Sequence, residues 1–492
     1  MLAVRCRLRG GLRVFLHEST SAMKRWLPLF LLLALALGPF AAHGQGVTSA
    51  TIKGTVVDEN GETLPGANVV AVHEPTGSRY GTITNEQGNF TVANVRVGGP
   101  YTITASFVGY QSKRETGIQL DLGETRSLQF QLRTQTEQLD EVEVTAEGEG
   151  AIFSEQRKGV STNISEEEIQ TAPTIDRSIA DFARFTPQAI VGNDDDDGSS
   201  ISIAGQNNRY NSIFIDGAVS NDVFGLSATG TDGGQTGATP ISIDAIEQFN
   251  IEVSPYDVTQ SYFGGGAINA VTRSGTNQYE GSVAFEYRDQ NFAEDLPDAP
   301  FPDFSNERYV GRFGGPIIED KLFFFANFDI NRESSPQPFE GGFEDYRGNA
   351  IQTEQDLQDL LTFVENTVGD RYDPGSFRGQ STTLDSDKFF GKLDWNINQN
   401  HRLSARYNYS ESVNTDAFGG SPTAISFSSR NEVFPNTTQT AAVELNSTFG
   451  NSLANKLIVS YKSVEDDRDT NLDQPFPTVD IGDGAGEISL GG

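Results

Sequence analysis

The most constraining feature of this chain is an alternation of apolar and polar residues on both sides of a short polar turn, "NQNH". Apolar residues recur at every second position, as Phe389, Gly391, Leu393, Trp395 and Ile397 and then as Leu403, Ala405, Tyr407 and Tyr409. The positions between them include Lys392, Asp394, Arg406 and Asn408. Because successive side chains of a strand point to opposite faces, the pattern predicts a β-hairpin over 388–410 with one apolar and one polar face.

Similar alternation recurs on both sides of this hairpin, in "GSVAFEYR", "KLFFFANFDI", "TAAVELNSTF" and "KLIVSYKSV". A membrane-spanning β-strand needs about 9 to 11 residues, with one face toward lipid and the other toward the lumen. We count about seven such strands between 280 and 466, too few to close a barrel. The short turns are expected at the periplasmic end and the long polar stretches at the extracellular end.

The composition excludes several classes of function. The chain has 35 Lys and Arg against 68 Asp and Glu, a net charge of −33, which disfavours nucleic acid as a partner. Its single cysteine, Cys6, lies near the start, so we expect no disulfides in the exported protein. Residues 23–44 have the pattern of a secretory signal peptide that is cleaved between Gly44 and Gln45. We expect translation to begin at Met23, with 1–22 a mis-assigned extension. A single-span N-terminal anchor is the alternative.

Candidate catalytic and metal-binding residues are sparse. Beyond the signal peptide only His73 and His401 remain, each isolated and expected in a solvated loop, so we expect no enzyme, no cofactor and no metal site. The acidic run Asn193 to Asp197 could attract a divalent cation, but it lacks the spacing of a calcium loop. A solvated loop is the favoured interpretation. No apolar run of helical spanning length follows the signal peptide.

Residues 45–133 read as a small β-sandwich, because short apolar runs alternate with turn residues. The segment resembles the carboxypeptidase regulatory-like domain at Gly54-x-Val56, Leu64-Pro65-Gly66-Ala67, Gly88-x-Phe90 and Gly109-Tyr110. That resemblance implies a prealbumin-like, Ig-like or carbohydrate-binding-like fold. The domain accompanies a peptidase in its name-giving family but does not carry the zinc site, and no peptidase follows here.

Residues 134–150 have the polar, acidic and glycine-ending composition of a linker. Within it, Val142 and Val144 alternate with acidic residues as in a short strand. On composition alone, a solvated linker is the favoured interpretation.

Residues 151–275 read as a small α+β domain. Ser165 and Glu168 form a capping-box pattern, and a second short helix is expected over 176–185. Short strands are expected in "SSISIAG", "YNSIFIDG", "IEQFNIEVSP" and around "GGGAINAVT".

The ordered motifs of this segment resemble the plug domain of TonB-dependent outer-membrane receptors. They are Ser200 to Gln206, Ile213 to Gly217, Ile243 to Phe249 with Val253, and Tyr262 to Gly275. Ala204 stands where arginine is common, and Ser254-Pro255 replaces the usual lysine-glycine. These departures favour the Oar-like branch, which also carries an N-terminal regulatory-like domain, over the starch-utilisation branch.

The resemblance implies a mainly β protein: the β-sandwich, the α+β plug over 151–275, and over 276–492 the first strands of an incomplete 22-stranded transmembrane β-barrel. It implies a receptor in the outer membrane, with plug and sandwich toward the periplasm, that imports a large substrate by energy-coupled plug displacement. The linker then holds the TonB box, the contact for a TonB-type inner-membrane energy transducer, at Leu139, Asp140, Glu141, Val142, Glu143, Val144, Thr145 and Ala146. Such a contact works by strand addition to a partner's sheet.

Two other functions stay open at this point. One is an outer-membrane ligand-binding or adhesion protein without active transport, and the other is a peptidase, indicated only by a domain name. The expected partners are the energy transducer, outer-membrane lipid and an extracellular ligand. That ligand is a peptide or protein, an oligosaccharide or a metal chelate, and the sequence does not decide among them.

Overall fold

The computed structural model describes residues 45–135, 142–145, 160–174, 177–194, 198–222, 224–227, 229–253, 264–293, 303–336, 346–369, 373–417, 420–450, 453–470 and 477–491. The expected extension and signal peptide, 1–44, lie outside these ranges, and Gln45 is the first described residue. None of the described helices combines the length and the apolar character needed to cross a membrane.

The N-terminal sandwich has two sheets, with the strand orders β4-β1-β7 and β3-β2-β5-β6-β8. The strands are β1 (Ala50–Val57), β2 (Asn68–His73), β3 (Ser78–Ile83), β4 (Asn89–Val95), β5 (Gly98–Ser106), β6 (Lys113–Leu120), β7 (Thr125–Gln131) and β8 (Val142–Thr145). Alternate residues of both sheets, among them Ile52, Ile103 and Phe130, are fully buried in one core. The sequence motifs predicted this sandwich, but β6 was not expected.

The central domain contains a five-stranded sheet of order β13-β12-β15-β14-β9 and a separate hairpin, β10–β11. Its strands are β9 (Ser161–Ile164), β10 (Ala189–Asp194), β11 (Gly198–Ile203), β12 (Ser212–Ile215), β13 (Ala218–Val219), β14 (Ile246–Glu252) and β15 (Ala267–Thr272). Every residue of β12 and β15 is buried, as expected for strands covered on both faces.

Two short helices complete the central domain. The expected capping box of Ser165 and Glu168 is present and begins α2 (Glu166–Thr171). The second helix, α3 (Ile179–Ala183), begins at a capping box of its own and is shorter than the expected 176–185. Its Phe182 ring stacks on Phe249 of β14, with 5.8 Å between ring centroids, so α3 packs on the five-stranded sheet.

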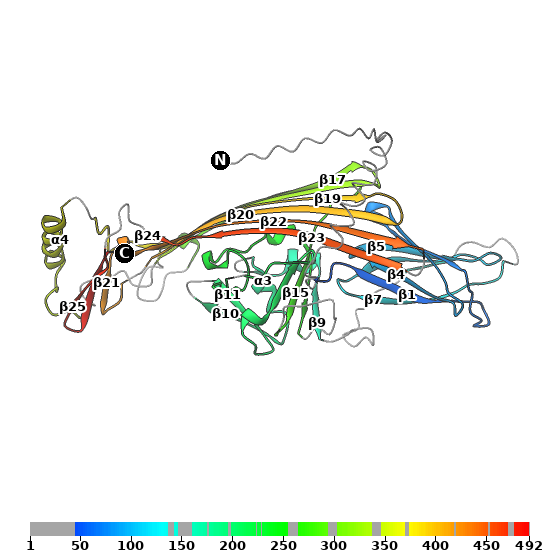
Figure 1. Cartoon of the computed structure of the whole chain (residues 1–492), viewed down its shortest axis with the longest axis horizontal. Helices are drawn as coiled ribbons and strands as arrows, with labels where there is room; N and C mark the ends of the chain where they lie inside the picture. The colour runs from blue at the N-terminus through cyan, green and yellow to red at the C-terminus, as the bar shows by residue number, and fades with distance from the viewer. Residues whose placement is uncertain are drawn as a thin grey trace, which may run out of the picture. The chain divides into compact units, whose positions relative to one another are not determined.

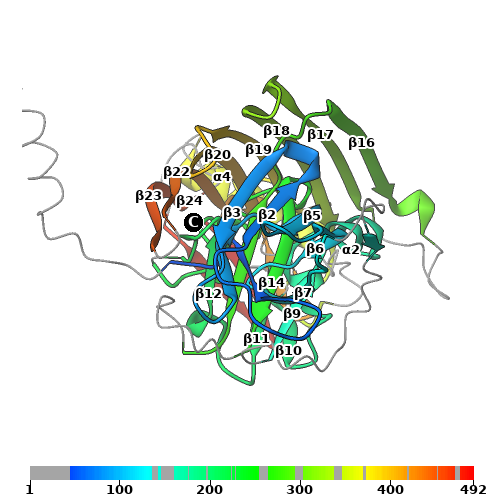
Figure 2. The same ribbon diagram turned by 90° about the vertical axis from the view of Figure 1, so that its right-hand side faces the viewer.

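Eight described strands between residues 280 and 470 form one long antiparallel sheet of order β16-β17-β18-β19-β20-β22-β23, with β24 paired to β22. Its strands are β16 (Glu280–Asp289), β17 (Ser305–Ile318), β18 (Leu322–Pro336), β19 (Ser381–Asn396), β20 (His401–Asp416), β22 (Glu432–Phe449), β23 (Leu453–Asp466) and β24 (Asp469–Thr470). Figure 2 shows this sheet curving around the central domain. The expected hairpins are confirmed, but β22 is 18 residues long and exceeds the expected spanning length.

The predicted alternation is confirmed on the two faces of the long sheet. On β19, Phe389 is 50% exposed on the outer face, whereas Lys392 on the inner face is 8% exposed. The inner face is less polar than expected, since Phe325 of β18 and Phe390 of β19 join the buried core of the central domain. These two rings belong to inward positions that sequence alternation assigned to polar groups.

The short turns and long connections of the sheet lie at opposite ends of its strands (Figure 1). The long connections form a small subdomain from α4 (Glu354–Val368), β21 (Ala424–Ser426), β25 (Val479–Asp483) and β26 (Gly486–Leu490). Leu357, Ile425, Phe427, Ile488 and Leu490 form its core. The amphipathic helix α4 therefore packs on its own loop and on strands from two other segments of the chain.

Candidate coupling site

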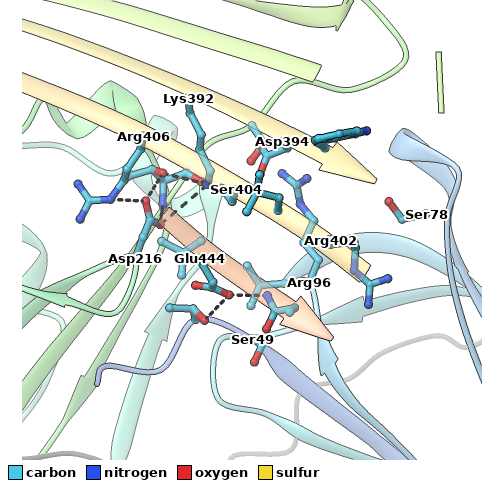
Figure 3. A pocket seen from close by; sticks show the side chains of 18 of the residues that line it. Ser49, Ser78, Arg96, Asp216, Lys392, Asp394, Arg402, Ser404, Arg406 and Glu444 are labelled. Carbon is cyan, nitrogen blue, oxygen red and sulfur yellow. Dashed lines mark hydrogen bonds and ion pairs between the residues drawn. The ribbon is translucent and has the colours of Figure 1, made fainter. Parts of the chain in front are cut away.

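The central domain, the long sheet and the sandwich meet around a pocket that many charged side chains line. Figure 3 shows that charged side chains from the three parts converge there, including Arg96 of the sandwich, Asp216 of the central domain, and Lys392, Arg406 and Glu444 of the long sheet. A pocket so rich in paired charges is poorly suited to an apolar ligand. Its contacts instead hold the three parts together.

Asp216 is at the centre of these contacts. It follows β12 in a turn with a left-handed backbone, φ 44°, a conformation that aspartate tolerates better than most residues. Its carboxylate accepts hydrogen bonds from the Thr272 backbone N, at 2.8 Å, and from Thr272 Oγ1, at 2.6 Å. On the sheet side, Arg406 Nε lies 3.1 Å and Lys392 Nζ 3.9 Å from the carboxylate oxygens.

These partners also control the charge of Asp216. Burial disfavours its ionised form, but the two cations and the Thr272 hydrogen bonds outweigh burial and lower the pKa of Asp216. The two cations bond to the central-domain backbone as well. Lys392 Nζ donates to Thr272 O at 2.9 Å, and Arg406 Nη2 donates to Ile215 O at 2.6 Å. The cluster is therefore an ionic clamp between the central domain and the sheet.

A second clamp lies farther from the sandwich. Lys462 Nζ of β23 donates to both carboxylate oxygens of Asp232, at 2.9 and 3.0 Å, and to Asn221 O at 3.0 Å. Asp232 is 1% exposed, and burial raises its pKa to about 6 even though Lys462 acts in the opposite direction. This carboxyl group therefore titrates much nearer to neutral pH than an exposed aspartate.

A row of hydrogen bonds joins β19 and β20 to the stretch 236–240 of the central domain. The pairs are Lys388 Nζ to Thr239 Oγ1 at 3.0 Å, Asn408 Nδ2 to Pro240 O at 2.9 Å, Asn414 Nδ2 to Thr236 O at 3.1 Å, and Ser412 Oγ with Thr236 Oγ1 at 2.8 Å. All four sheet residues are buried. The polar inner face of the hairpin thus serves to hold the central domain.

The sandwich contacts both neighbours. Arg96 Nη2 lies 3.7 Å from Glu247 of the central domain, and Arg402 stacks over the Tyr80 ring at 3.7 Å from its centroid. Asn396 Nδ2, next to the β19–β20 turn, donates to Ser78 Oγ at 2.9 Å. The sandwich therefore packs at the end of the long sheet that carries the short turns.

Of the expected TonB box, the structure describes the backbone of Val142–Thr145 as strand β8, while Leu139, Asp140, Glu141 and Ala146 lie outside the described residues. Strand β8 pairs in parallel with β6, from Lys113 opposite Val142 to Thr116 opposite Thr145. It ends the five-stranded sheet of the sandwich. The half-strand predicted from the alternation is thus present, on a sheet edge that the sequence did not indicate.

The other singled-out residues lie apart from the clamps. Gly44 is outside the described residues, and Gln45 is half-buried. In the acidic run, Asn193 and Asp194 end β10, and 195–197 are not described, so the loop expected there is in part a strand. Within the described ranges, no group of three or more His, Cys, Asp and Glu side chains is placed to hold a metal ion.

The expectation of a solvated loop was wrong for His73, which ends β2 and is 4% exposed. Burial and the nearby Arg96 lower its pKa to about 3, so the ring is neutral at ordinary pH. Its Nδ1 shares a hydrogen bond with Thr76 Oγ1 at 2.7 Å, which satisfies one ring nitrogen of this buried side chain. The expectation was also wrong for His401, which begins β20, is half-buried and shares a hydrogen bond from its Nδ1 with Ser447 Oγ at 2.9 Å. Both histidines have structural partners.

Three family models match this chain. The carboxypeptidase regulatory-like domain matches 51–133, the TonB-dependent receptor plug domain matches 154–271, and an outer membrane beta barrel domain matches 271–343 and 338–488. This chain carries the domains of a TonB-dependent outer-membrane receptor. The central domain is therefore the plug, the long sheet is barrel wall, and the protein belongs to the outer membrane.

Two curated relatives carry the same assignment in their names. Over 408 residues the chain is 27% identical to the TonB-dependent transporter Oar of Myxococcus xanthus, covering 76% of this chain and 35% of the relative. Over 263 residues it is 27% identical to the TonB-dependent receptor SusC of Bacteroides thetaiotaomicron, covering 52% of this chain and 25% of the relative. The chain thus spans about a third of the length of the first relative and about a quarter of the length of the second.

Among solved structures, the outer membrane transporter YddB from Escherichia coli is 15% identical, with a TM-score of 0.46. The match covers 68% of this chain and 43% of that chain.

The sequence did not single out the clamp residues as a site. Asp216 was noted only within the Ile213 to Gly217 motif, and Lys392 and Arg406 only as inward-facing positions of a hairpin. One signal was available, since long cationic side chains on the lumen face of a barrel strand need a polar or anionic partner. The identity of that partner depends on the fold.

Proposed function

We propose that the protein imports a large substrate across the outer membrane by energy-coupled displacement of its plug. The observation that carries this proposal is the juxtaposition of a clamped plug with a strand-forming peptide just before it. The plug is held by the Asp216 and Asp232 clamps. Strand β8 precedes β9, the first plug strand in the sequence, by a short segment. In this proposal the sandwich and the plug face the periplasm.

The nature of the clamps supports a need for external energy. Removing one partner of a buried ion pair costs about 3 to 5 kcal/mol, because the other charge then stays buried without a partner, and each net hydrogen bond contributes about 1 kcal/mol. Two clamps and the row of bonds along 236–240 therefore make spontaneous release of the plug rare. A substrate at the outer face could loosen some contacts, but work from the inner membrane supplies the remainder.

The place at which force would arrive supports the same proposal. Among the described strands, β9 is the edge strand of the plug sheet and pairs only with β14, over four residue pairs from Ile164 to Ser161. A pull on the linker therefore reaches a sheet edge, where backbone bonds break one after another rather than all together. An edge strand is the part of a sheet that is most easily removed.

The transducer contact is proposed at Leu139 to Ala146. Strand addition uses backbone hydrogen bonds for affinity and alternate side chains for specificity. The strand conformation of Val142–Thr145 supports this proposal, because a peptide that already forms a strand loses less entropy on binding. The substrate class stays open among peptides or proteins, oligosaccharides and metal chelates.

A proline substitution tests the contact. Val142→Pro removes one backbone donor and disturbs the strand, so we expect affinity for the periplasmic domain of a TonB protein to fall roughly tenfold or more. Glu149→Pro, in the same linker but outside the box, is the matched control and should bind like the wild type. Binding is measured on each variant in detergent-solubilised outer membranes, where the periplasmic face is accessible to the added domain. Equal binding by both variants would contradict the proposed contact.

An uptake experiment separates transport from adhesion. Cells are given fluorescent dextran, labelled casein peptides or a ferric siderophore, with and without a protonophore. A transporter accumulates one of these probes only in energised cells, and Val142→Pro abolishes the accumulation. An adhesion protein retains the probe at the surface to the same extent under all of these conditions.

A further inference from the structure

We propose that residues 45–49, defined here as the strap, fasten the plug to the barrel wall and form part of the closed gate. The strap directly precedes β1 of the sandwich. Within five residues it contacts the plug, two wall strands and the sandwich. The proposal concerns the resting state and does not depend on energy transduction, so it goes beyond the function proposed above.

On the plug side the strap is held by its backbone. Gly46 N donates to Gly217 O at 3.2 Å, and Val47 N donates to Asn269 Oδ1 at 3.0 Å. Asn269 lies in β15 and is fully buried. A Cβ at position 46 would lie 2.4 Å from Phe214 Cβ, so only glycine fits at this point of closest approach.

On the wall side the strap is held by its side chains. Thr48 Oγ1 donates to Glu444 Oε1 of β22 at 3.2 Å. Lys456 Nζ of β23 donates to Thr48 Oγ1 at 2.7 Å and to Ser49 Oγ at 2.9 Å. An acidic side chain of β22, Glu444, and a basic side chain of the neighbouring β23, Lys456, therefore bind the hydroxyl groups of two consecutive strap residues. Figure 3 shows Ser49 and Glu444 beside the same pocket as the Asp216 clamp.

On the sandwich side the strap is continuous with the fold. Ser49 O accepts a hydrogen bond from Gly123 N at 3.3 Å. The Val47 side chain packs in a small cluster with Val97 and Leu122 of the sandwich and Val271 of the plug. The plug thus leaves the wall only if it breaks its own bonds to the strap at Gly46 and Val47, or if the strap detaches from Glu444 and Lys456.

The strap also covers the turn that carries the first clamp. A Cβ on Gly217, the residue after Asp216, would lie 2.9 Å from Thr48 Cγ2 and 2.6 Å from Ile458 Cδ1 of the wall. Plug turn, strap and wall are therefore in van der Waals contact at one place. Loss of the strap would leave a gap between plug and wall beside the clamp.

The first test measures passive leakage. A leucine at position 46 does not fit beside Phe214, so we expect Gly46→Leu to displace the strap. The inhibitory concentration of vancomycin should then fall about fivefold or more. This is the factor by which the loss of one or two contacts changes the population of a two-state equilibrium. Gly81→Leu is the matched control, because Gly81 is exposed and a Cβ added there meets no atom within 4 Å. If Gly46→Leu does not assemble, Lys456→Met, which removes the cation that binds Thr48 and Ser49, replaces it.

The second test measures packing. In a Cys6→Ser background, Thr48→Cys should react with a maleimide about tenfold or more slowly than a cysteine at the exposed Glu86, because a packed segment reacts only through local opening. Adding Lys456→Met should accelerate the reaction. Equal rates at 48 and 86 would overturn the proposal. So would slow labelling together with unchanged exclusion of vancomycin, because the strap would then be packed but not needed for closure.

Discussion

At the scale of single residues, plug and wall are joined by side chains that are distant in the sequence. Asp216 pairs with Lys392 and Arg406, and Asp232 pairs with Lys462. The sequence predicted that Lys392 and Arg406 face inward, because strand alternation is a local property. It did not predict their partners, since partner choice depends on how the plug docks. The same holds for His73, whose burial follows from the packing of the sandwich.

Asp232 gives a prediction about pH. Its pKa in the folded protein is about 6, above the value near 4 of an unfolded aspartate, so the folded state binds this proton more tightly. Its contribution to stability is therefore fully present below about pH 4 and is lost as the pH rises through 6. That contribution is roughly 3 kcal/mol. Asp232→Asn removes the titrating group and should flatten the dependence over this range.

The measurement is thermal unfolding of the folded protein at pH 4, 5, 6 and 7. Asp359→Asn is the control, since it makes the same change of charge at an exposed position of α4. We expect the control to follow the wild-type pH profile. If Asp232→Asn kept the pH dependence of the wild type, the Asp232 carboxyl group would not titrate between about pH 4 and 6, and the prediction would be wrong.

At the scale of elements, the long amphipathic strands could be predicted from sequence and several short strands could not. The hairpin over 388–410 has an unbroken two-residue period, so both its existence and its faces were predicted correctly. β6, β9 and β13 lack such a period or are very short, and tertiary contacts decide their conformation. Alternation also predicted the strand at 142–145, but its pairing with β6 is a property of the folded sandwich.

The outer face of β19 gives a prediction about insertion. Phe389 lies on that face at mid-strand, so Phe389→Arg places a cation toward lipid and should destabilise the folded barrel by about 2 to 4 kcal/mol. Thr383→Arg, at a position of the same parity near the strand end, should cost about 0 to 1 kcal/mol. Urea unfolding in lipid vesicles measures both values. Equal costs at the two positions would contradict a lipid-facing orientation of Phe389.

At the scale of the whole molecule, three parts meet at one end of the barrel wall. The motifs in the sequence predicted which parts exist, and the family matches confirm them. The arrangement that joins them was not predictable. In each contact between parts, the local sequence around one residue gives no indication of its partner. These contacts are Arg96 with Glu247, Arg402 with Tyr80, and the strap with Glu444. The sandwich is thereby in direct contact with both the plug and the wall.

The central claim is that work applied at Leu139 to Ala146 moves the plug away from the wall. Ser412 of the wall reports on this movement, because it is 2% exposed and its Oγ hydrogen-bonds with Thr236 of the plug. The most direct measurement is maleimide labelling of Ser412→Cys, with Cys6→Ser, in living cells. We predict faster labelling in energised than in protonophore-treated cells, and no such difference when Val142→Pro is added. The same rate in all three cases would contradict the account.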